Sequence, residues 1–428
     1  MTDYQQIFKE IVDILHHDYA GYEEKRGWDE PAYYIEKIEQ LMTEDAMTPF
    51  IFSNVVNDYL MAFQDQHMSF SFNGSDDMKA KYRGFRTRRC DEGLIVIETV
   101  KESRFPVGSQ IITIDGQTIS QIIATNRYFL SGISAEREDW MPIFNQSSWI
   151  EVEYPDGTQA SFELRNYEAV SINQSPSIKE LDNNTIYLHF PSFMNVNETL
   201  DFVKKVEGKI CSCHHLIIDV RDNHGGNGKS YSTLMPFLFR PGEHPPTTSE
   251  LKEFNYTNRN ADLFIQLCQR MAKQVTDEKT LELFASIEED CEKYRGQGFV
   301  LMDFSEELAA AASTFMGHDY PINVIVMTDV YCASAAEYFV ETCQSSSKTT
   351  VIGRATMGVN DYSDLVVKNW GQLYSLYYPI SRRVNQTPND PLHGKGIQPD
   401  HYIPWTPQHL KENVDLLYAL EFLKNNER

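Results

Sequence analysis

The sequence predicts an α/β fold in which a helical segment and a small β-rich module precede a core of alternating strands and helices. Residues 216–220 form an apolar run of the kind found in strands buried on both faces of a parallel sheet. From about residue 184 onward, strand-like runs alternate with helix-like runs. In the same region, Ser334 lies between a strand-like run at 323–328 and a helix-like run at 335–340. These three observations predict an α/β core in the second half of the chain.

The N-terminal segment is predicted to be helical. Apolar residues recur there at helical spacing, for example Ile7, Ile11 and Leu15. The polar loop at residues 73–77 is typical of a boundary between structural units. We therefore predict a helical segment over residues 1–77.

The next part of the chain reads as short strands. Residues 93–100 and 107–119 are strand-like, and the second run is turned by an Asp-Gly pair. Residues 149–154 meet residues 160–164 across a Pro-Asp-Gly turn, which predicts a hairpin. The pattern predicts a separate β-rich module over residues 78–175.

The remaining residues, 176–428, form the predicted α/β core. Residues 185–190 are strand-like and residues 200–206 are helix-like, and the alternation resumes at residue 322. Between them, a charged and helical-looking stretch at about 249–315 is predicted to be an insertion in the core.

Composition bounds the function classes. The chain has 428 residues, 41% of them hydrophobic, and a formal net charge of −24. Such a negative balance argues against nucleic acid or an anionic membrane as partner. No apolar run approaches the roughly 18 residues of a membrane-spanning helix, and the N-terminus lacks a secretory pattern. Seven dispersed cysteines favour reduced thiols and a cytoplasmic location, and nothing indicates an oligomeric state.

Five short motifs follow one another along the chain. They are DQH at residues 65–67, LIIDVRDNHGG at 216–226, ASAAE at 333–337, VIGRATMG at 351–358 and GIQPD at 396–400. In this order they resemble peptidase family S41, the C-terminal processing and tricorn-core serine proteases. Residues 107–116 likewise resemble the PDZ-like domain of that family.

The resemblance implies a crotonase/ClpP-like α/β core and a PDZ-like module. It also implies hydrolysis of peptide bonds through an acyl-enzyme, with a peptide or protein as substrate and no metal or organic cofactor. A PDZ-like module can recognise an extended peptide by strand addition, although a purely structural role is an open alternative.

Ser334 is the predicted nucleophile, because it matches the reactive serine of the family. Alanines on either side let a substrate carbonyl approach its hydroxyl, and the helix that follows presents amide groups to an oxyanion. We predict that these amides come from Gly225 or Gly226 and from Ala335. Cys332, two residues before the serine, is a less favoured nucleophile.

The predicted general base is His67. The processing-protease branch of the family uses a lysine where this chain has Val359, and valine cannot take a proton. The tricorn-like branch uses a histidine at the end of the N-terminal helices, and His67 matches that position. Imidazole suits a proton shuttle. The alternative role for a histidine in such a loop is to cap a helix.

The third member of the site stays open. The tricorn-like pattern places a glutamate shortly before GIxPD, and His393 stands at the nearest position here. Asp361 and Asp390 are the acidic alternatives, although aspartate is also common in turns.

Two other functions remain as alternatives. Val359 and the missing acid motivate a catalytically inactive peptide-binding scaffold on the same fold. A crotonase-like enzyme of acyl-CoA chemistry is the weaker alternative. A metal site at Cys211, Cys213, His214 and His215 is disfavoured, because no second ligand pair follows at a suitable spacing.

Overall fold

The computed structural model describes residues 3–74, 82–91, 93–125, 130, 135–168, 175–246, 251–273, 278–303, 305–384 and 395–426. The chain divides into two compact units, each made from segments that are distant in sequence. Unit 1 comprises Met1–Ala80, Glu250–Phe304 and Asp361–Gln386. Unit 2 comprises Lys81–Ser249, Ser305–Asn360 and Thr387–Arg428.

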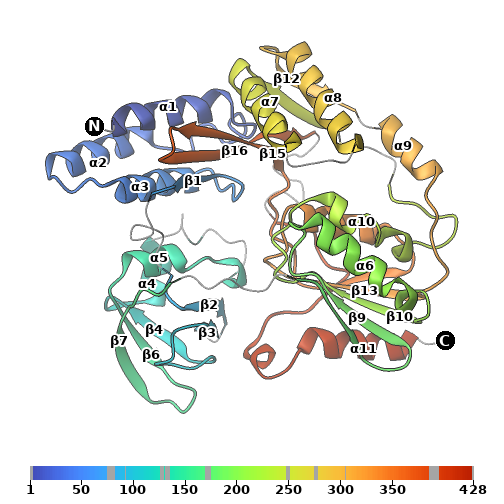
Figure 1. The fold of residues 1–428 in the computed structure, drawn as a ribbon. Coiled ribbons are helices and arrows are strands. Elements are labelled where there is room, and N and C mark those ends of the chain that lie inside the picture. Colours follow the sequence, from blue (N-terminus) through green and yellow to red (C-terminus); the bar gives the residue numbers. More distant parts are fainter. Residues whose placement is uncertain are drawn as a thin grey trace. The chain divides into compact units, whose positions relative to one another are not determined.

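Unit 1 combines helices with an antiparallel sheet (Figure 1). Its helices are α1 (Tyr4–His17), α2 (Pro31–Thr43), α3 (Pro49–Met61), α7 (Asn258–Ala272) and α8 (Glu278–Tyr294). Its strands are β1 (Ser69–Phe72), β11 (Lys252–Tyr256), β12 (Gly298–Met302), β15 (Tyr362–Trp370) and β16 (Tyr374–Arg383). The strand order is β1-β16-β11-β12, and β15 also pairs with β16. The stretch predicted to be a helical insertion therefore contains two strands, β11 and β12, beside its helices.

Local signals explain where the N-terminal helices begin. The side chain of Asp3 accepts a hydrogen bond from the amide of Gln6 at the start of α1. Thr48 accepts one from the amide of Ile51, and Pro49 occupies the first turn of α3. The predicted helices of the N-terminal segment are confirmed as α1, α2 and α3, and the predicted range 1–77 also contains strand β1.

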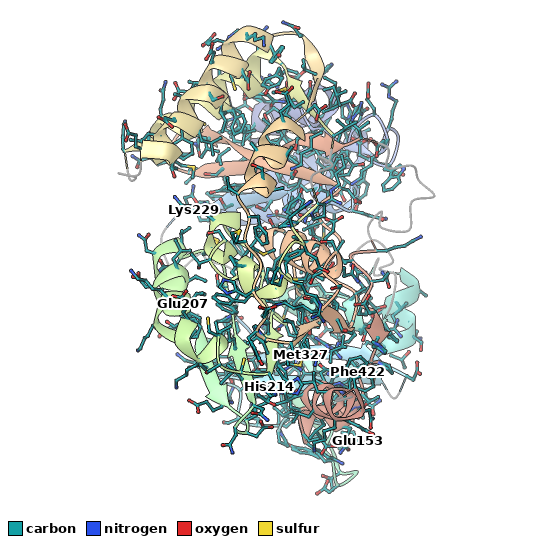
Figure 2. The ribbon with its side chains drawn as sticks, turned by 90° about the vertical axis from the view of Figure 1, so that its right-hand side faces the viewer. Glu153, Glu207, His214, Lys229, Met327 and Phe422 are labelled. Atoms are coloured by element: carbon teal, nitrogen blue, oxygen red, sulfur yellow. The ribbon has the colours of Figure 1, made fainter. Side chains whose placement is uncertain are left out.

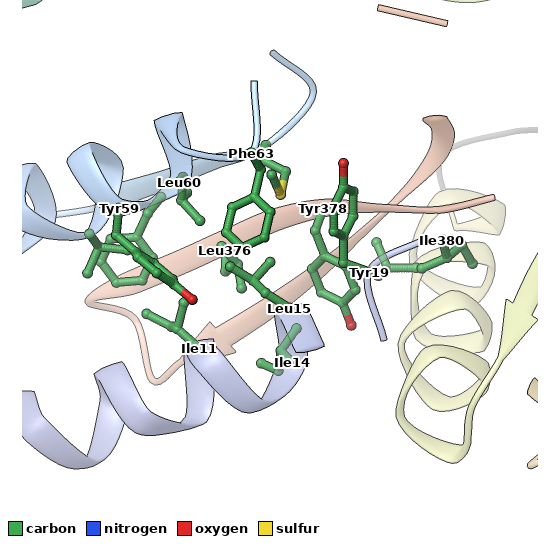
Figure 3. Close-up of a cluster of buried hydrophobic side chains, with 14 of the residues drawn as sticks. Ile11, Ile14, Leu15, Tyr19, Tyr59, Leu60, Phe63, Leu376, Tyr378 and Ile380 are labelled. Carbon is green, nitrogen blue, oxygen red and sulfur yellow. The ribbon is translucent and has the colours of Figure 1, made fainter. Parts of the chain in front are cut away.

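The core of unit 1 joins the N-terminal helices to β16, a strand about 360 residues later in the chain. Figure 3 shows Ile11 and Leu15 of α1 among the buried side chains that also include Leu376 and Tyr378 of β16. Burying one such side chain contributes about 1.5–3 kcal/mol. This packing holds the loop that follows α3, in which His67 lies.

Unit 2 contains two sheets. Its helices and 3-10 turns are α4 (Ile119–Thr125), η2 (Ala135–Arg137), α5 (Met141–Gln146), α6 (Val196–Ile210), η3 (Gly228–Tyr231), η4 (Met235–Leu238), α9 (Ser305–Ser313), α10 (Ala335–Gln344), η5 (Pro407–Leu410) and α11 (Val414–Asn426). Each sheet has six strands. The β2–β7 sheet contains β2 (Phe85–Cys90), β3 (Gly93–Thr99), β4 (Gln110–Ile114), β5 (Gln117–Thr118), β6 (Trp149–Glu153) and β7 (Gln159–Glu163). The β8–β17 sheet contains β8 (Ser177–Glu180), β9 (Thr185–His189), β10 (His215–Asp219), β13 (Asn323–Thr328), β14 (Thr349–Gly353) and β17 (His401–Tyr402).

The β8–β17 sheet has the order β17-β14-β13-β10-β9-β8, with parallel pairing from β17 to β9. Alternate residues of its strands enter two separate cores. Ile218 and Val326 pack with α6 and α10, whereas Ile217 and Met327 pack with α11. Figure 2 labels Met327 together with Phe422 of α11, which belongs to the same cluster. The predicted doubly buried strand at 216–220 is confirmed as β10, and the mixed α/β fold is confirmed with it.

The β2–β7 sheet is antiparallel and has its own core, which includes Phe85, Trp140 and Phe144. The predicted hairpin is confirmed, because β6 and β7 are antiparallel neighbours. The three-domain boundaries predicted from the sequence stay a prediction. No helix among the described residues is long and apolar enough to cross a membrane.

Asp415, in the first turn of α11, lies at the centre of a buried ion network. Its carboxylate accepts hydrogen bonds from Arg354 at 2.9 and 2.6 Å, from Arg221 at 2.7 Å and from His409 at 3.2 Å. Burial alone would raise the pKa of Asp415. Hydrogen bonds from His409 and Arg354, together with the charges of Arg354 and Arg221, outweigh burial and hold the pKa well below its ordinary value of 3.8.

Replacing Asp415 with asparagine is expected to lower the free energy of unfolding by about 3–5 kcal/mol at neutral pH, because the buried guanidinium group of Arg354 loses its counter-charge and Arg221 keeps only that of Asp219. A depressed carboxyl pKa contributes stability above the unfolded-state pKa and loses it as the pH falls through the folded-state pKa. The difference between wild type and variant should therefore shrink below about pH 4. Urea unfolding at several pH values measures this difference.

Asp201→Asn, at an exposed position of α6, is the control and should change stability by less than about 0.5 kcal/mol. Equal stability of Asp415→Asn and wild type at neutral pH would contradict this assignment.

Candidate active site

Ser334 occupies a strained turn between β13 and α10. It is the N-cap of α10, with φ 54° and ψ −122°, a backbone conformation that residues other than glycine rarely adopt. Its side chain is half-buried, whereas Ala333 and Ala335 on either side are buried. Strain of this kind costs about 1–3 kcal/mol and is concentrated at functional sites.

Glu337 ties this turn to a second segment of unit 2. Its carboxylate is 1% exposed and accepts four hydrogen bonds. The donors are the amide of Ser334 at 3.2 Å, Thr356 Oγ1 at 2.6 Å, the amide of Gly358 at 2.6 Å and the amide of Val359 at 3.0 Å. Glu337 therefore fixes residues 356–359 against the serine turn. The S-x-x-E spacing at a helix start is the sequence signal that could have identified Glu337.

Gly225 lies directly against Ser334. A Cβ atom at this glycine would lie 2.8 Å from Cβ of Ser334 and 2.6 Å from the carbonyl oxygen of Ala333, and its φ is +92°. Only glycine suits both the space and the backbone conformation. Its amide donates to Oδ1 of Asn223 at 2.9 Å, so this N–H is already engaged.

Gly226 and Ala335 are the other predicted oxyanion donors. Gly226 has φ +137° and lies against the backbone of Phe193 and Met194. The amides of Gly226 and Ala335 donate to no other group in the part of the chain that the structure describes. Two of the three predicted amides are thus available for a ligand oxygen.

Val359 and Asn360 follow the segment held by Glu337. Val359 is buried, as the apolar side chain suggests. Asn360 is also buried, and its Nδ2 donates to the backbone oxygen of Ser334 at 3.0 Å. Asn360 was not singled out from the sequence, since an asparagine in a polar loop carries no distinctive signal.

Residues of the β2–β7 sheet contact Asp329 and Tyr331, which precede Ser334 in the chain. Arg88 of β2 pairs with Asp329 at 3.2 Å, and both are buried. The guanidinium groups of Arg86 and Arg88 lie 4.6 and 4.9 Å from the centre of the Tyr331 ring. Burial raises the pKa of Asp329, but the charges of Arg88 and Arg354, together with hydrogen bonds from Tyr331 and Arg88, outweigh burial and lower it. The β2–β7 sheet therefore supports the segment just before the serine.

Arg137, in η2, contacts the segment on the other side of the serine turn. Its Nη2 donates to the carbonyl oxygen of Met357, and its Nη1 donates to that of Lys395 at 2.6 Å. Residues 356–359, which Glu337 binds, are therefore also bound by Arg137, which follows the first strands of the β2–β7 sheet in the chain.

His67 belongs to unit 1, in the loop between α3 and β1. Its Nδ1 lies 2.7 Å from the carbonyl oxygen of Tyr362, and its amide donates to Oδ1 of Asp65 at 2.9 Å. A carbonyl only accepts, so Nδ1 is the protonated nitrogen and Nε2 carries the lone pair. The ring is thus oriented by a main-chain carbonyl.

Of the three candidates for the group that orients His67, the structure describes only Asp361. Asp361 is buried in unit 1, and its charge acts on the buried amine of Lys25. Asp390 and His393 lie outside the described residues. None of these candidacies is tested by the structure, and each stays a prediction.

The cysteines give no second site. Cys332 is fully buried, and burial raises the pKa of its thiol well above 9.0, which disfavours the thiolate that a nucleophile requires. Cys213 is also buried, and its Sγ donates to the carbonyl of Ile210 at 3.3 Å. Within the described ranges, no group of three or more His, Cys, Asp or Glu residues could hold a metal ion. All seven cysteines are free.

The chain resembles known proteins both in a family profile and in its fold. The profile described as "Peptidase family S41" matches residues 184–403, a little more than half of the chain. The crystal structure of mature CPAF is 13% identical, with a TM-score of 0.63, and the match covers 100% of this chain and 98% of that chain. Mature CPAF complexed with lactacystin is also 13% identical, with a TM-score of 0.64 and coverage of 98% and 97%. At this identity the likeness shows a shared fold. No curated protein matches the chain.

Proposed function

The chain belongs to peptidase family S41 and is a serine-type peptidase, and from this premise we propose that it cleaves peptide or protein substrates through an acyl-enzyme on Ser334. In this proposal His67 is the general base and acid. The amides of Gly226 and Ala335 stabilise the oxyanion. No nucleic acid or membrane takes part.

The short segment from Asn360 to Tyr362 supports the pairing of Ser334 with His67, because each of its ends is hydrogen-bonded to one of these two residues. In unit 2, Asn360 donates to the backbone oxygen of Ser334. In unit 1, Tyr362 accepts from Nδ1 of His67. The polypeptide passes from one unit to the other between Asn360 and Asp361. The Cα atoms of Asn360 and Tyr362 are therefore at most about 7 Å apart. The residues that bind Ser334 and His67 are thus joined by a very short piece of chain.

The proposed reaction follows from the states of these groups. Ser334 Oγ attacks the carbonyl carbon of the scissile bond while its proton passes to Nε2 of His67. The same nitrogen then gives the proton to the departing amine as the C–N bond breaks, which leaves the acyl group on Ser334. Water, deprotonated by His67, cleaves this ester and restores the serine.

The oxyanion donors act at the N-terminus of α10. Ala335 is the first residue of this helix, where free amides and the helix dipole both favour negative charge. Loss of one such donor typically costs about 2.7–4 kcal/mol of transition-state stabilisation. We assign oxyanion stabilisation to the amides of Ala335 and Gly226. Gly225, which has no side chain, allows the glycine loop to lie directly against Ser334.

The finer description of the fold belongs to the same proposal. A parallel sheet in which β13 leads through Ser334 into α10 supports a crotonase/ClpP-like core. The antiparallel β2–β7 sheet supports a PDZ-like module, and β2 at its edge pairs only with β3 among the described strands. An edge strand of this kind can accept a peptide by strand addition. A cytoplasmic location stays a prediction from the free cysteines.

A fluorophosphonate probe tests the proposed function. We expect it to label Ser334 in the wild type and to label it much more slowly in His67→Ala, as read by mass spectrometry of the labelled peptide. Ser345, at the other end of α10, should stay unlabelled. An inert Ser334 in a protein that still binds peptides would favour the scaffold alternative.

Gly225→Ala is expected to lower kcat/KM by roughly a hundredfold, because the new Cβ displaces the serine turn and displacements of about 1 Å can have that effect. Gly208→Ala, in α6, is the matched control. A Cβ there meets no atom within 4 Å, so activity should be retained. Full activity of Gly225→Ala would show that this close approach does not shape the site.

A further inference from the structure

Unit 1 buries an amine that the proposed reaction does not use. Lys25 is 3% exposed, and lysine is rarely buried without partners. Its Nζ donates to the hydroxyl of Tyr19 at 3.1 Å and lies 4.4 Å from the centre of the Tyr362 ring. These two aromatic residues are the first members of two paths that lead to His67.

The first path runs through hydrogen bonds to the backbone of His67. The hydroxyl of Tyr19 donates to Oδ2 of Asp65 at 2.7 Å. The other oxygen of Asp65 accepts from the amide of His67 at 2.9 Å. Asp65 therefore ties the position of His67 to the Lys25–Tyr19 pair.

The second path ends on the imidazole itself. The ring of Tyr362 lies beside Lys25, its hydroxyl donates to Glu24, and its carbonyl accepts from Nδ1 of His67 at 2.7 Å. Gly21 allows this arrangement, because a Cβ there would lie 2.9 Å from the Tyr362 ring and even closer to the Tyr19 hydroxyl. The rings of Tyr19 and Tyr362 are 5.6 Å apart.

We propose that Lys25 is a positioning residue for the general base. Through Tyr19 and Asp65 it fixes the loop, and through Tyr362 it fixes the carbonyl that keeps Nδ1 of His67 protonated and Nε2 free. Lys25 and Tyr362 thereby perform the orienting role for which the sequence offered Asp361, Asp390 and His393. The catalytic meaning of this arrangement rests on the proposed function, whereas the tautomer of His67 does not.

Three acidic side chains near the buried amine of Lys25 favour its charged form. Burial lowers the pKa of its amine, and the charges of Asp65, Asp361 and Glu24 counteract that effect in part. The neutral groups around the amine are the hydroxyl of Tyr19 and the rings of Tyr362 and Trp28. Asp361, one of the predicted orienting groups, acts on His67 only indirectly in this proposal, because its charge attracts the amine of Lys25.

The tautomer of His67 tests the proposal directly. Long-range ¹H–¹⁵N spectra of the full-length protein report which imidazole nitrogen carries the proton, and His67→Gln assigns the signal. We expect the Nδ1–H form in the wild type. In Lys25→Met, which keeps the volume but removes the charge, the Nε2–H form that prevails in unconstrained histidine should increase. Tyr19→Phe, which deletes one hydroxyl, should shift the tautomer in the same direction and serves if Lys25→Met fails to fold.

Kinetics give the second readout. A positioned general base typically contributes about 10²–10⁴-fold, so both variants should lower kcat by roughly 10- to 100-fold and leave KM nearly unchanged. Lys37→Met is the matched control, since Lys37 is a half-buried lysine of the same unit and pairs with Asp58 at 3.3 Å. It should change neither readout. An unaltered tautomer and an unaltered kcat in Tyr19→Phe and in folded Lys25→Met would overturn the proposal. Undiminished activity in His67→Gln would instead refute the proposed function while leaving the tautomer result intact.

Discussion

Ser334→Ala is expected to lower the rate of peptide hydrolysis by roughly 10⁴-fold or more, the largest effect of any single substitution in this chain. The reason is chemical, because no other side chain replaces the attacking oxygen. Cys332 is buried with a raised thiol pKa and therefore offers no thiolate. Release of a fluorophore from a panel of quenched peptides measures the rate.

The variant should fold normally and keep its affinity for peptides, since the glycine loop and the amides of α10 are unchanged. Ser345→Ala is the matched control, because this serine lies at the C-terminal end of the same helix and bonds only locally to Thr342. It should retain activity. Substantial hydrolysis by purified Ser334→Ala would mean that another residue is the nucleophile.

His67→Ala is expected to produce the second largest loss, about 10³-fold or more, because an alcohol needs a base within hydrogen-bond reach to attack an amide. Added imidazole should restore part of the activity by entering the space left by the side chain. The double variant Ser334→Ala, His67→Ala should be scarcely worse than Ser334→Ala alone, since residues that act as a unit are not additive. Progress curves for the three variants measure this.

His17→Ala is the control for this series, because His17 is exposed on α1 in the same unit. It should behave as the wild type. Additive losses in the double variant would show that Ser334 and His67 act independently of each other.

Much of the fold could be predicted because its signals are local. The apolar run of β10, the strand–serine–helix sequence around Ser334 and the turn between β6 and β7 each depend on neighbouring residues. His67 could be proposed from its place after the helices in a recognisable motif. The choice of Ser334 needed both local pattern and family resemblance.

The remaining parts depend on contacts between residues far apart in the sequence. Glu337 binds the amides of Gly358 and Val359, and Tyr362 accepts from a histidine nearly 300 residues earlier. No spacing rule reveals such pairs. The candidates for the orienting group of His67 were side chains, those of Asp361, Asp390 and His393, whereas Nδ1 of His67 contacts a main-chain carbonyl, which every residue possesses. Strands β11 and β12 were missed because they are short and lie within charged, helix-forming sequence.

The pairing of Ser334 with His67 is tested most directly by a peptidyl chloromethyl ketone. The ketone carbon accepts the serine oxygen, and the nearby methylene loses chloride to a histidine nitrogen, so one inhibitor molecule reports on both groups. We predict alkylation of His67 at Nε2, found by mass spectrometry, with a hemiketal on Ser334 in the crystal structure and much slower alkylation in Ser334→Ala. Loss of peptidase activity with His67 unmodified and another residue alkylated would contradict the pairing.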